Sequence, residues 1–418
     1  MNLNSNVWIL SKSFFKWTWR KRFYSSAATP LKVPNISENL SSFKKLKYPE
    51  SMFVYCNDVA KDISDTISVH LTKKYGKKKI EIIEANPGPC LITQHLLKKT
   101  NYNICVYENN YVFKEYLMAV HSNYGDRIKI NHGNFLLLWK FGFQDRMDRG
   151  DRVSKFLSSI GTPQQPWNQE RPSLKIIASL PNKKFMNYLI YSFIFQTGLM
   201  VYGRPEFYFL LSPSVFKRYS CKPIIDKKYY KTQTILFQTI FDIESLKTYP
   251  RTAFFPPHIS KSASKNGKNV RYKELKEADD KYMILAKVVG RREILNSEGL
   301  TEDLLKPYWY FVKHHTLSRK NFVIPMLEQW IPGCGPYFIA QGYTIFTQFG
   351  DLTPPQILRL FLKFISLPEY NDSPFLNSME SRIAKLLPSL QIPPDDSITE
   401  LSENNSSIDF EDFNNKDN

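Results

Sequence analysis

The sequence predicts an α/β protein with a doubly wound, mostly parallel sheet, followed by a small C-terminal helical domain. Three observations lead to this prediction. Short β-branched runs alternate with helix-periodic segments from residue 80 to about residue 220, as in successive βαβ units. A glycine-containing turn follows the first of these runs. After Thr301 the strand-like runs stop, and apolar residues recur at helical spacing.

The expected strands are short and mostly apolar. They are residues 80–84, 104–108, 128–130, 174–180, 206–211, 235–243 and 282–289. Helical periodicity fills the intervals between most of them, and a further helix precedes the first strand at 51–71. In the C-terminal part, Thr353-Pro354-Pro355 is a typical helix start, with an N-cap residue followed by prolines in the first turn.

Composition divides the chain into five parts. These are a targeting segment at 1–24, a linker at 25–50, an α/β domain at 51–299 with an insertion at 141–173, a helical domain at 300–394, and an acidic tail at 395–418. The tail holds eight acids against one lysine, so we expect it to be disordered.

The first 24 residues have the composition of a mitochondrial presequence. They carry five lysines and arginines among serines and aromatic residues, and the first acid of the chain is Glu38. A secretory signal would instead need a continuous apolar region. We therefore predict cleavage after Tyr24 and a location in the mitochondrial matrix. An ordinary basic N-terminal arm is the alternative.

The net charge of +18 indicates a polyanionic partner, either nucleic acid or an anionic membrane surface. The tail carries −7 and the targeting segment +5, which leaves +20 on residues 25–394. No run of about 18 apolar residues exists, so we predict no membrane span. The five cysteines lack CxxC spacing, which argues against a zinc site or a disulfide framework, and we expect no metal.

A strand, a glycine turn, a helix and a second strand ending in an acid form the usual order of a nucleoside site. Here Glu84 ends the first strand, Asn86-Pro87-Gly88-Pro89 forms the turn, and Glu108 ends the second strand. Glu108 is therefore a candidate ribose acceptor. With a single glycine the motif is weak, and by itself an ordinary strand-to-helix turn would explain it equally well.

The segment at 84–97, EANPGPCLITQHLL, resembles the first methyltransferase motif of the ribosomal RNA adenine dimethylase family, and within it the mitochondrial transcription factor B branch. Further segments resemble the family in the same order, at 156–181, 202–211, 254–257, 318–327 and 352–355. The resemblance spans about 80–390 and implies a class I, Rossmann-like methyltransferase sheet. It also implies an S-adenosylmethionine site at Glu84, Asn86, Gly88, Glu108 and Asn134.

The chain departs from the family pattern at the positions that would carry out the chemistry. Asn86 stands where active members have the first glycine, and Asn134 where they have a carboxylate. The catalytic tetrapeptide Asn-Leu-Pro-aromatic, which holds a flipped adenine, reads Ser179-Leu180-Pro181-Asn182. We expect no catalytic residue and at most a vestigial cofactor site, although Ser179 can still accept one hydrogen bond.

One basic cluster is interleaved with aromatic residues, which is typical of single-strand binding. Its candidate contacts are Tyr308, Trp309, Lys313, His314, Arg319 and Lys320. Four consecutive rings at 308–311 cannot all face inward on an ordinary surface helix, so we expect some of them to be exposed. The alternative is that these rings form the core of the helical domain.

Two functions compete at this point. The resemblance implies a non-enzymatic initiation factor that binds mitochondrial RNA polymerase, helps to melt promoter DNA and holds the single-stranded non-template strand. The alternative is a mitochondrial rRNA adenine dimethyltransferase using S-adenosylmethionine, and Asn86 and Ser179 to Asn182 argue against it. A third reading is a generic RNA-binding protein of ribosome assembly.

Deleting residues 395–418 should tighten binding of the free protein to random duplex DNA, most of all at low salt. The reason is that a segment of net −7 competes with DNA for a body of net +20, and salt screens that competition. Fluorescence anisotropy of full-length and truncated protein at several salt concentrations measures the effect. Equal affinities at low salt would mean that the tail does not cover the basic surface.

Overall fold

The computed structural model describes residues 34, 36, 52–76, 80–180, 183–256, 273–295 and 299–386. The predicted presequence at 1–24 and the acidic tail at 395–418 lie outside these residues. So does the 25–50 linker except for Pro34 and Ile36, and so does the end of the helical domain at 387–394.

A seven-stranded sheet forms the centre of the protein, in the order β4-β3-β2-β5-β6-β9-β7. The first five strands in that order pair in parallel, and β9 is antiparallel to both β6 and β7. This arrangement confirms the doubly wound, mostly parallel sheet. The strands are β2 (Glu81–Ala85), β3 (Asn103–Glu108), β4 (Ile128–His132), β5 (Leu174–Leu180), β6 (Pro205–Leu211), β7 (Phe241–Pro250) and β9 (Tyr282–Gly290).

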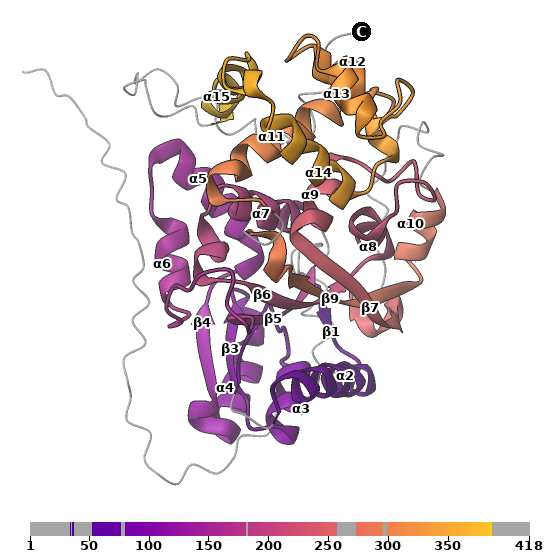
Figure 1. The fold of residues 1–418 in the computed structure, drawn as a ribbon. Coiled ribbons are helices and arrows are strands. Elements are labelled where there is room, and N and C mark those ends of the chain that lie inside the picture. The colour runs from indigo at the N-terminus through magenta and orange to yellow at the C-terminus, as the bar shows by residue number, and fades with distance from the viewer. Residues whose placement is uncertain are drawn as a thin grey trace, which may run out of the picture.

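Helices cover both faces of this sheet (Figure 1). One face packs against α2 (Asn57–Tyr75), α3 (Leu91–Lys99) and α4 (Lys114–Tyr124). The other packs against α5 (Leu138–Asp148), α6 (Arg152–Ser158), α7 (Lys183–Ile194) and α9 (Thr232–Ile240), while α8 (Pro213–Ser220) and α10 (Lys273–Asp279) lie near β7 and β9. Because both faces are covered, β6 is buried at all seven positions, which explains its continuous apolar sequence.

The predicted strand at 235–243 is wrong in its first part. Residues 232–240 form helix α9, and the strand β7 begins only at Phe241. The cause is burial: α9 contacts α7, α8, α11 and α14, so it has almost no polar face. A helix that is apolar nearly all round lacks the periodicity that separates it from a buried strand.

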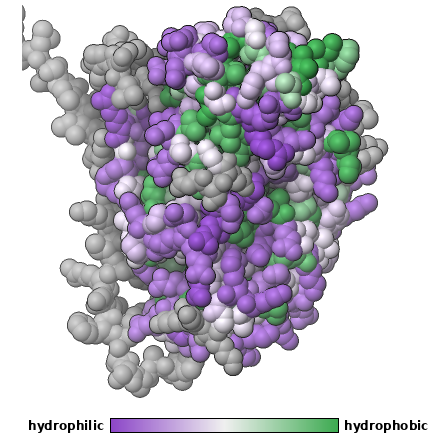
Figure 2. Space-filling view, viewed as in Figure 1, coloured by the Kyte–Doolittle hydropathy of each residue, from purple (hydrophilic) through white to green (hydrophobic). Residues whose placement is uncertain are grey.

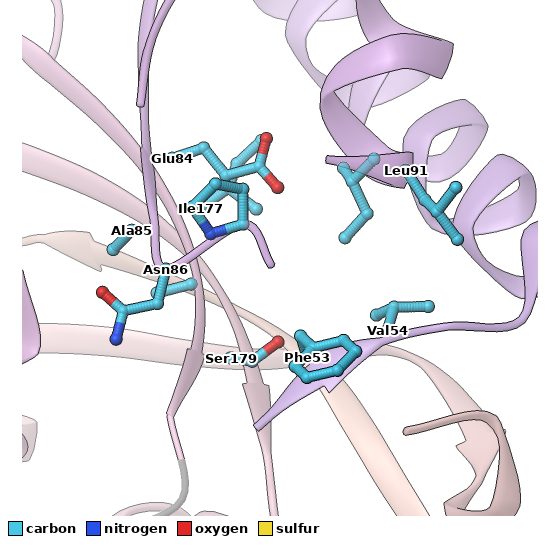
Figure 3. A pocket seen from close by; sticks show the side chains of 11 residues that line it. Phe53, Val54, Glu84, Ala85, Asn86, Leu91, Ile177 and Ser179 are labelled. Atoms are coloured by element: carbon cyan, nitrogen blue, oxygen red, sulfur yellow. The ribbon is translucent and has the colours of Figure 1, made fainter. Parts of the chain in front are cut away.

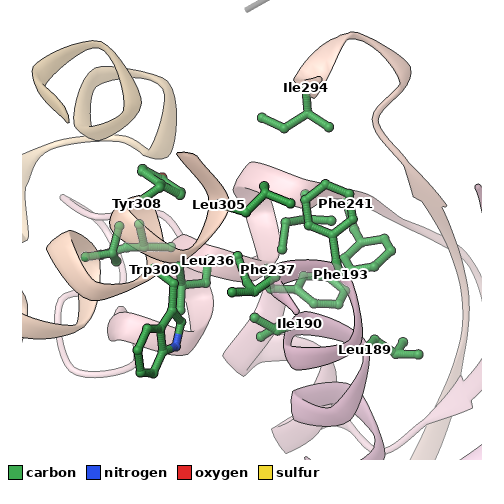
Figure 4. Close-up of a cluster of buried hydrophobic side chains, with 14 of the residues drawn as sticks. Leu189, Ile190, Phe193, Leu236, Phe237, Phe241, Ile294, Leu305, Tyr308 and Trp309 are labelled. Atoms are coloured by element: carbon green, nitrogen blue, oxygen red, sulfur yellow. The ribbon is translucent and has the colours of Figure 1, made fainter. Parts of the chain in front are cut away.

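The C-terminal part is helical, as predicted, with α11 (Leu305–His315), α12 (Val323–Glu328), α13 (Gly335–Ala340), α14 (Pro354–Ile365) and α15 (Phe375–Leu386). Thr353 caps α14, and its backbone N–H donates to Gln356 Oε1 at 2.8 Å. Helix α11 joins this part to the sheet, because Leu305, Tyr308 and Trp309 lie in one cluster with Phe193 and Phe237 (Figure 4).

A second, two-stranded sheet pairs β1 (Phe53–Val54) with β8 (Phe254–Phe255) in antiparallel register. The surface in view is largely hydrophilic, with apolar residues in separate patches (Figure 2). Within the described ranges, no helix has both the length and the apolar composition needed to cross a membrane.

Candidate functional site

The turn between β2 and α3 keeps a glycine-type backbone with only one glycine. Asn86, Gly88 and Cys90 all have positive φ, at 54°, 59° and 59°. Residues other than glycine adopt this left-handed conformation at a cost of roughly 1–2 kcal/mol each, and asparagine does so most readily. The turn therefore has the shape of a cofactor loop, but it carries side chains at two of its three left-handed positions.

Two buried carboxyls lie beside this turn. Glu108 accepts hydrogen bonds from the backbone N–H of Gly88 at 3.1 Å and from that of Asn110 at 2.8 Å. Glu84 accepts from Thr93 Oγ1 at 2.5 Å. Both side chains are almost fully buried, and burial is the main reason that the pKa of each rises to about 7. The charge of Glu108 also raises the pKa of Glu84, whereas the Thr93 hydrogen bond lowers it.

A hydrogen bond between two asparagines crosses the carboxyl edge of the sheet. Asn86 Nδ2 donates to Asn134 Oδ1 at 3.0 Å, and the same oxygen accepts from the backbone N–H of Leu136 at 3.0 Å. Asn86 follows β2 and Asn134 follows β4, so this bond passes the end of β3, where Glu108 lies. The two departures from the family pattern therefore contact each other.

Phe53 of β1 fills the space in front of the turn, which the sequence patterns did not predict. A Cβ placed on Gly88 would lie 2.7 Å from Cβ of Phe53. The ring of Phe53 also packs against Phe113 and Phe255, at centroid distances of 4.9 and 5.4 Å. Only the apolar runs at 52–54 and 253–255 indicated such packing, and neither belongs to a recognisable site motif.

The cavity that remains is very small. Glu84, Asn86 and Ser179 line one side of it, and Phe53, Val54 and Leu91 the other (Figure 3). Only about 10 Å³ is open to the centres of water-sized molecules, which is room for one water. Ligand pockets usually measure roughly 300–1,000 Å³. In this structure the residues present do not fit S-adenosylmethionine.

The structure describes part of the predicted tetrapeptide. Ser179 is buried near the end of β5 and lines the same cavity as Glu84 and Asn86. Leu180 ends β5, but its side chain lies outside the described residues, as do Pro181 and Asn182. The structure therefore brings together all six described candidates of the cofactor and catalytic sets, Glu84, Asn86, Gly88, Glu108, Asn134 and Ser179.

The prediction of exposed rings in α11 is wrong. Tyr308 and Trp309 are 1% and 0% exposed, and Tyr310 and Phe311 are buried as well. These residues are enclosed because α11 is a central helix that contacts α7, α9, α14 and α15. Tyr308 and Trp309 therefore belong to the core and cannot stack on bases in this structure.

The cations of the same cluster differ in their surroundings. Arg319 is held by hydrogen bonds to the backbone oxygens of Lys227 and Gly350 and by an ion pair with Asp351. Lys313 is partly buried over the Trp309 ring, and burial, assisted by Arg382, lowers its pKa to about 8. His314 is half-buried, so Lys320 is the one fully exposed member among the six predicted nucleic-acid contacts.

Comparison with known proteins gives consistent relatives. Residues 44–264 match the family model described as ribosomal RNA adenine dimethylase. Mitochondrial dimethyladenosine transferase 2 of Drosophila melanogaster is 30% identical over 381 residues, covering 82% of each chain. The human protein of the same name is 22% identical over 60% of this chain and 62% of its own length. Ribosomal RNA small subunit methyltransferase A of Cytophaga hutchinsonii is 25% identical over 53% of this chain and 70% of its own.

The wild-type protein should bind S-adenosylmethionine no more tightly than about 100 μM, because Phe53 and the Asn86–Asn134 bond occupy the site. Isothermal titration calorimetry tests this. The double variant Asn86→Gly/Asn134→Asp should gain affinity, whereas Asn134→Asp alone should not. Micromolar binding by the wild type, with methyl transfer to a small-subunit rRNA hairpin, would contradict the closed site.

The stability of the protein should fall as the pH rises through the range in which the two buried carboxyls ionise. Each carboxyl has a pKa near 4.5 when unfolded and about 7 when folded, so the folded state binds more protons between those values. The free energy of unfolding should therefore be highest below about pH 4.5. It should decrease up to about pH 7, by on the order of 1–3 kcal/mol for each carboxyl, and then level off.

Urea unfolding between about pH 5 and pH 8 measures this dependence. Glu84→Gln mimics the protonated acid and should flatten the decrease, whereas Glu115→Gln on the exposed face of α4 should not. Parallel curves for the wild type and Glu84→Gln would show that the pKa of Glu84 is not raised.

Proposed function

The chain belongs to the ribosomal RNA adenine dimethylase family, and from this premise we propose that it is a mitochondrial transcription initiation factor. In this role it binds promoter DNA together with mitochondrial RNA polymerase, helps to separate the strands and holds the single-stranded non-template strand. It transfers no methyl group. The basic N-terminal segment and the names of the mitochondrial relatives support a location in the mitochondrial matrix.

The observation that carries this proposal is the closed cofactor site. Three independent features act against S-adenosylmethionine: Phe53 lies over Gly88, the side chains of Asn86 and Asn134 are joined, and the cavity has room for one water. In addition, the family tetrapeptide offers a ring that stacks on the target base, and this chain has Asn182 at that position. Loss of such a platform removes about 1–3 kcal/mol of stacking per base.

A basic surface supports nucleic-acid binding without catalysis. Arg319 NH1 donates to Lys227 O at 2.8 Å, which joins the segment before α9 to the segment after α11. Two basic runs that are distant in sequence thus form one surface, which we call the basic corner and define as Lys227, Lys228, Lys231 and Lys320, all exposed. Exposed lysines that neutralise phosphates give affinity without sequence preference and with strong salt dependence.

A dimethyltransferase is the second candidate, and specific observations favour it. Glu84 and Glu108 keep the positions of cofactor-binding acids, and Ser179 lies beside them with a hydroxyl that can accept a hydrogen bond. Relatives of the chain are also named dimethyladenosine transferases. This function requires that Phe53 and the β2–α3 turn separate before the cofactor binds.

Specific initiation by mitochondrial RNA polymerase separates the two functions. The protein should be required on a duplex promoter and largely dispensable on the same promoter with a pre-melted bubble, because its role is to open and hold the strands. Replacing Lys227, Lys228 and Lys320 with alanine should reduce initiation on the duplex several-fold. It should also lower the salt slope by about 0.7 for each lost single-strand phosphate contact.

The matched control replaces Lys61, Lys98 and Lys99, which are exposed on α2 and α3, and should change initiation by less than about twofold. Equal transcription with and without the protein on both templates, together with methylation of an rRNA hairpin, would favour the dimethyltransferase instead.

A further inference from the structure

A second cavity, far larger than the first, lies between α5, α7 and the start of α11. It measures about 400 Å³, and its walls include the rings of Trp139, Tyr188, Tyr191 and Phe195. It shares no lining residue with the candidate cofactor site. We call it the α5–α7 cavity. Its volume is in the range of small-ligand pockets, and nothing in the family motifs accounts for it.

Three buried polar atoms of this cavity have no hydrogen-bond partner among the described residues. They are Trp139 Nε1, Tyr188 Oη and Ser192 Oγ. Buried polar groups are nearly always hydrogen-bonded, so three such atoms around one cavity indicate a missing polar partner. Gly198 has a φ of 58°, and a Cβ there would collide with Tyr188 Oη. A glycine at 198 therefore leaves the room that the tyrosine hydroxyl occupies.

The charges around the cavity are mainly positive. Arg146 lines it and Lys306 stands exposed at its edge. Lys184 lies over the Trp139 ring, 4.7 Å from its centroid. The one acid in the lining, Asp145, already forms an ion pair with Arg152 at 3.1 Å. The cavity thus combines aromatic walls, unsatisfied hydrogen-bonding groups and cations that an anionic group could contact.

We propose that the α5–α7 cavity binds a nucleotide, with the base between the aromatic walls and the phosphate toward Arg146 and Lys306. A purely apolar ligand would leave Trp139 Nε1, Tyr188 Oη and Ser192 Oγ without partners, whereas the ring nitrogens and exocyclic groups of a base can satisfy them. Aromatic stacking and a nearby arginine or lysine are the usual means of holding a base and its phosphate. The proposal does not rest on the function proposed above, because the two sites share no residue.

Two sources provide this chemistry, a free nucleotide and one nucleotide of a bound strand. Isothermal titration of the full-length protein with AMP, and separately with a twelve-nucleotide oligo(dA), distinguishes them. A response to AMP that depends on the cavity indicates a free nucleotide. A response to oligo(dA) alone indicates a strand.

Variants that keep the rings test the polar atoms. Trp139→Phe and Tyr188→Phe should each weaken binding about 3- to 10-fold, as expected for one lost hydrogen bond. Because each removes an unsatisfied buried group from the ligand-free protein, its melting temperature should stay equal or rise, which separates the effect from misfolding. Tyr55→Phe, on the opposite face of the sheet, is the matched control and should change affinity by less than twofold.

Two further variants test the space and the charge. Gly142→Leu should abolish binding, because a Cβ at Gly142 meets Tyr188 at an ordinary 3.5 Å and the longer side chain extends into the cavity. Lys306→Ala should weaken binding mainly at low salt, with Lys98→Ala as its control. If neither AMP nor oligo(dA) responds to any of the cavity variants, the cavity is not a nucleotide site and the proposal is overturned.

Discussion

Phe53 packs directly on Gly88, and this contact joins three parts of the chain that lie far apart in the sequence. The strand β1 brings Phe53 to the turn, the strand β8 holds it from behind through Phe255, and the turn itself accepts it only because residue 88 has no side chain. The backbone of the same glycine donates to Glu108, so the position of the second acidic residue depends on this packing as well. The carboxyl edge of the sheet is therefore a small hydrophobic core where related folds have a ligand site.

The two large hydrophobic clusters assign different roles to the two faces of the sheet. The cluster with α2, α3 and α4 includes Phe53 and closes the cofactor edge. The cluster with α7 and α9 continues without interruption into α11 and α14, so the C-terminal helices share a core with the sheet. This continuity explains why Trp309 contacts Tyr191 and Phe195, and why the α5–α7 cavity has walls from both parts of the chain.

The sequence predicted the sheet and the approximate order of its strands, because a strand buried on both faces or a turn with glycine leaves a local signal. It also predicted which side chains meet at the carboxyl edge, since parallel strands end together. It misplaced α9 and the rings of α11 because both helices are surrounded by others, and burial on all sides erases helical periodicity. Phe53 and the α5–α7 cavity arise from long-range packing and have no local pattern.

The bond between Asn86 and Asn134 has a consequence for how such a protein can change over generations. If an ancestor had glycine and a carboxylate at these positions, as the active relatives of the family do, the two substitutions are now mutually dependent. Reverting Asn86 alone removes the donor that Asn134 uses, and reverting Asn134 alone places a negative charge in a nearly dry pocket beside Glu108. Each single step back lowers fitness before any ancestral activity could return. The pair therefore acts as an epistatic ratchet, and selection can refine the non-catalytic surfaces without a direct route back to the enzyme.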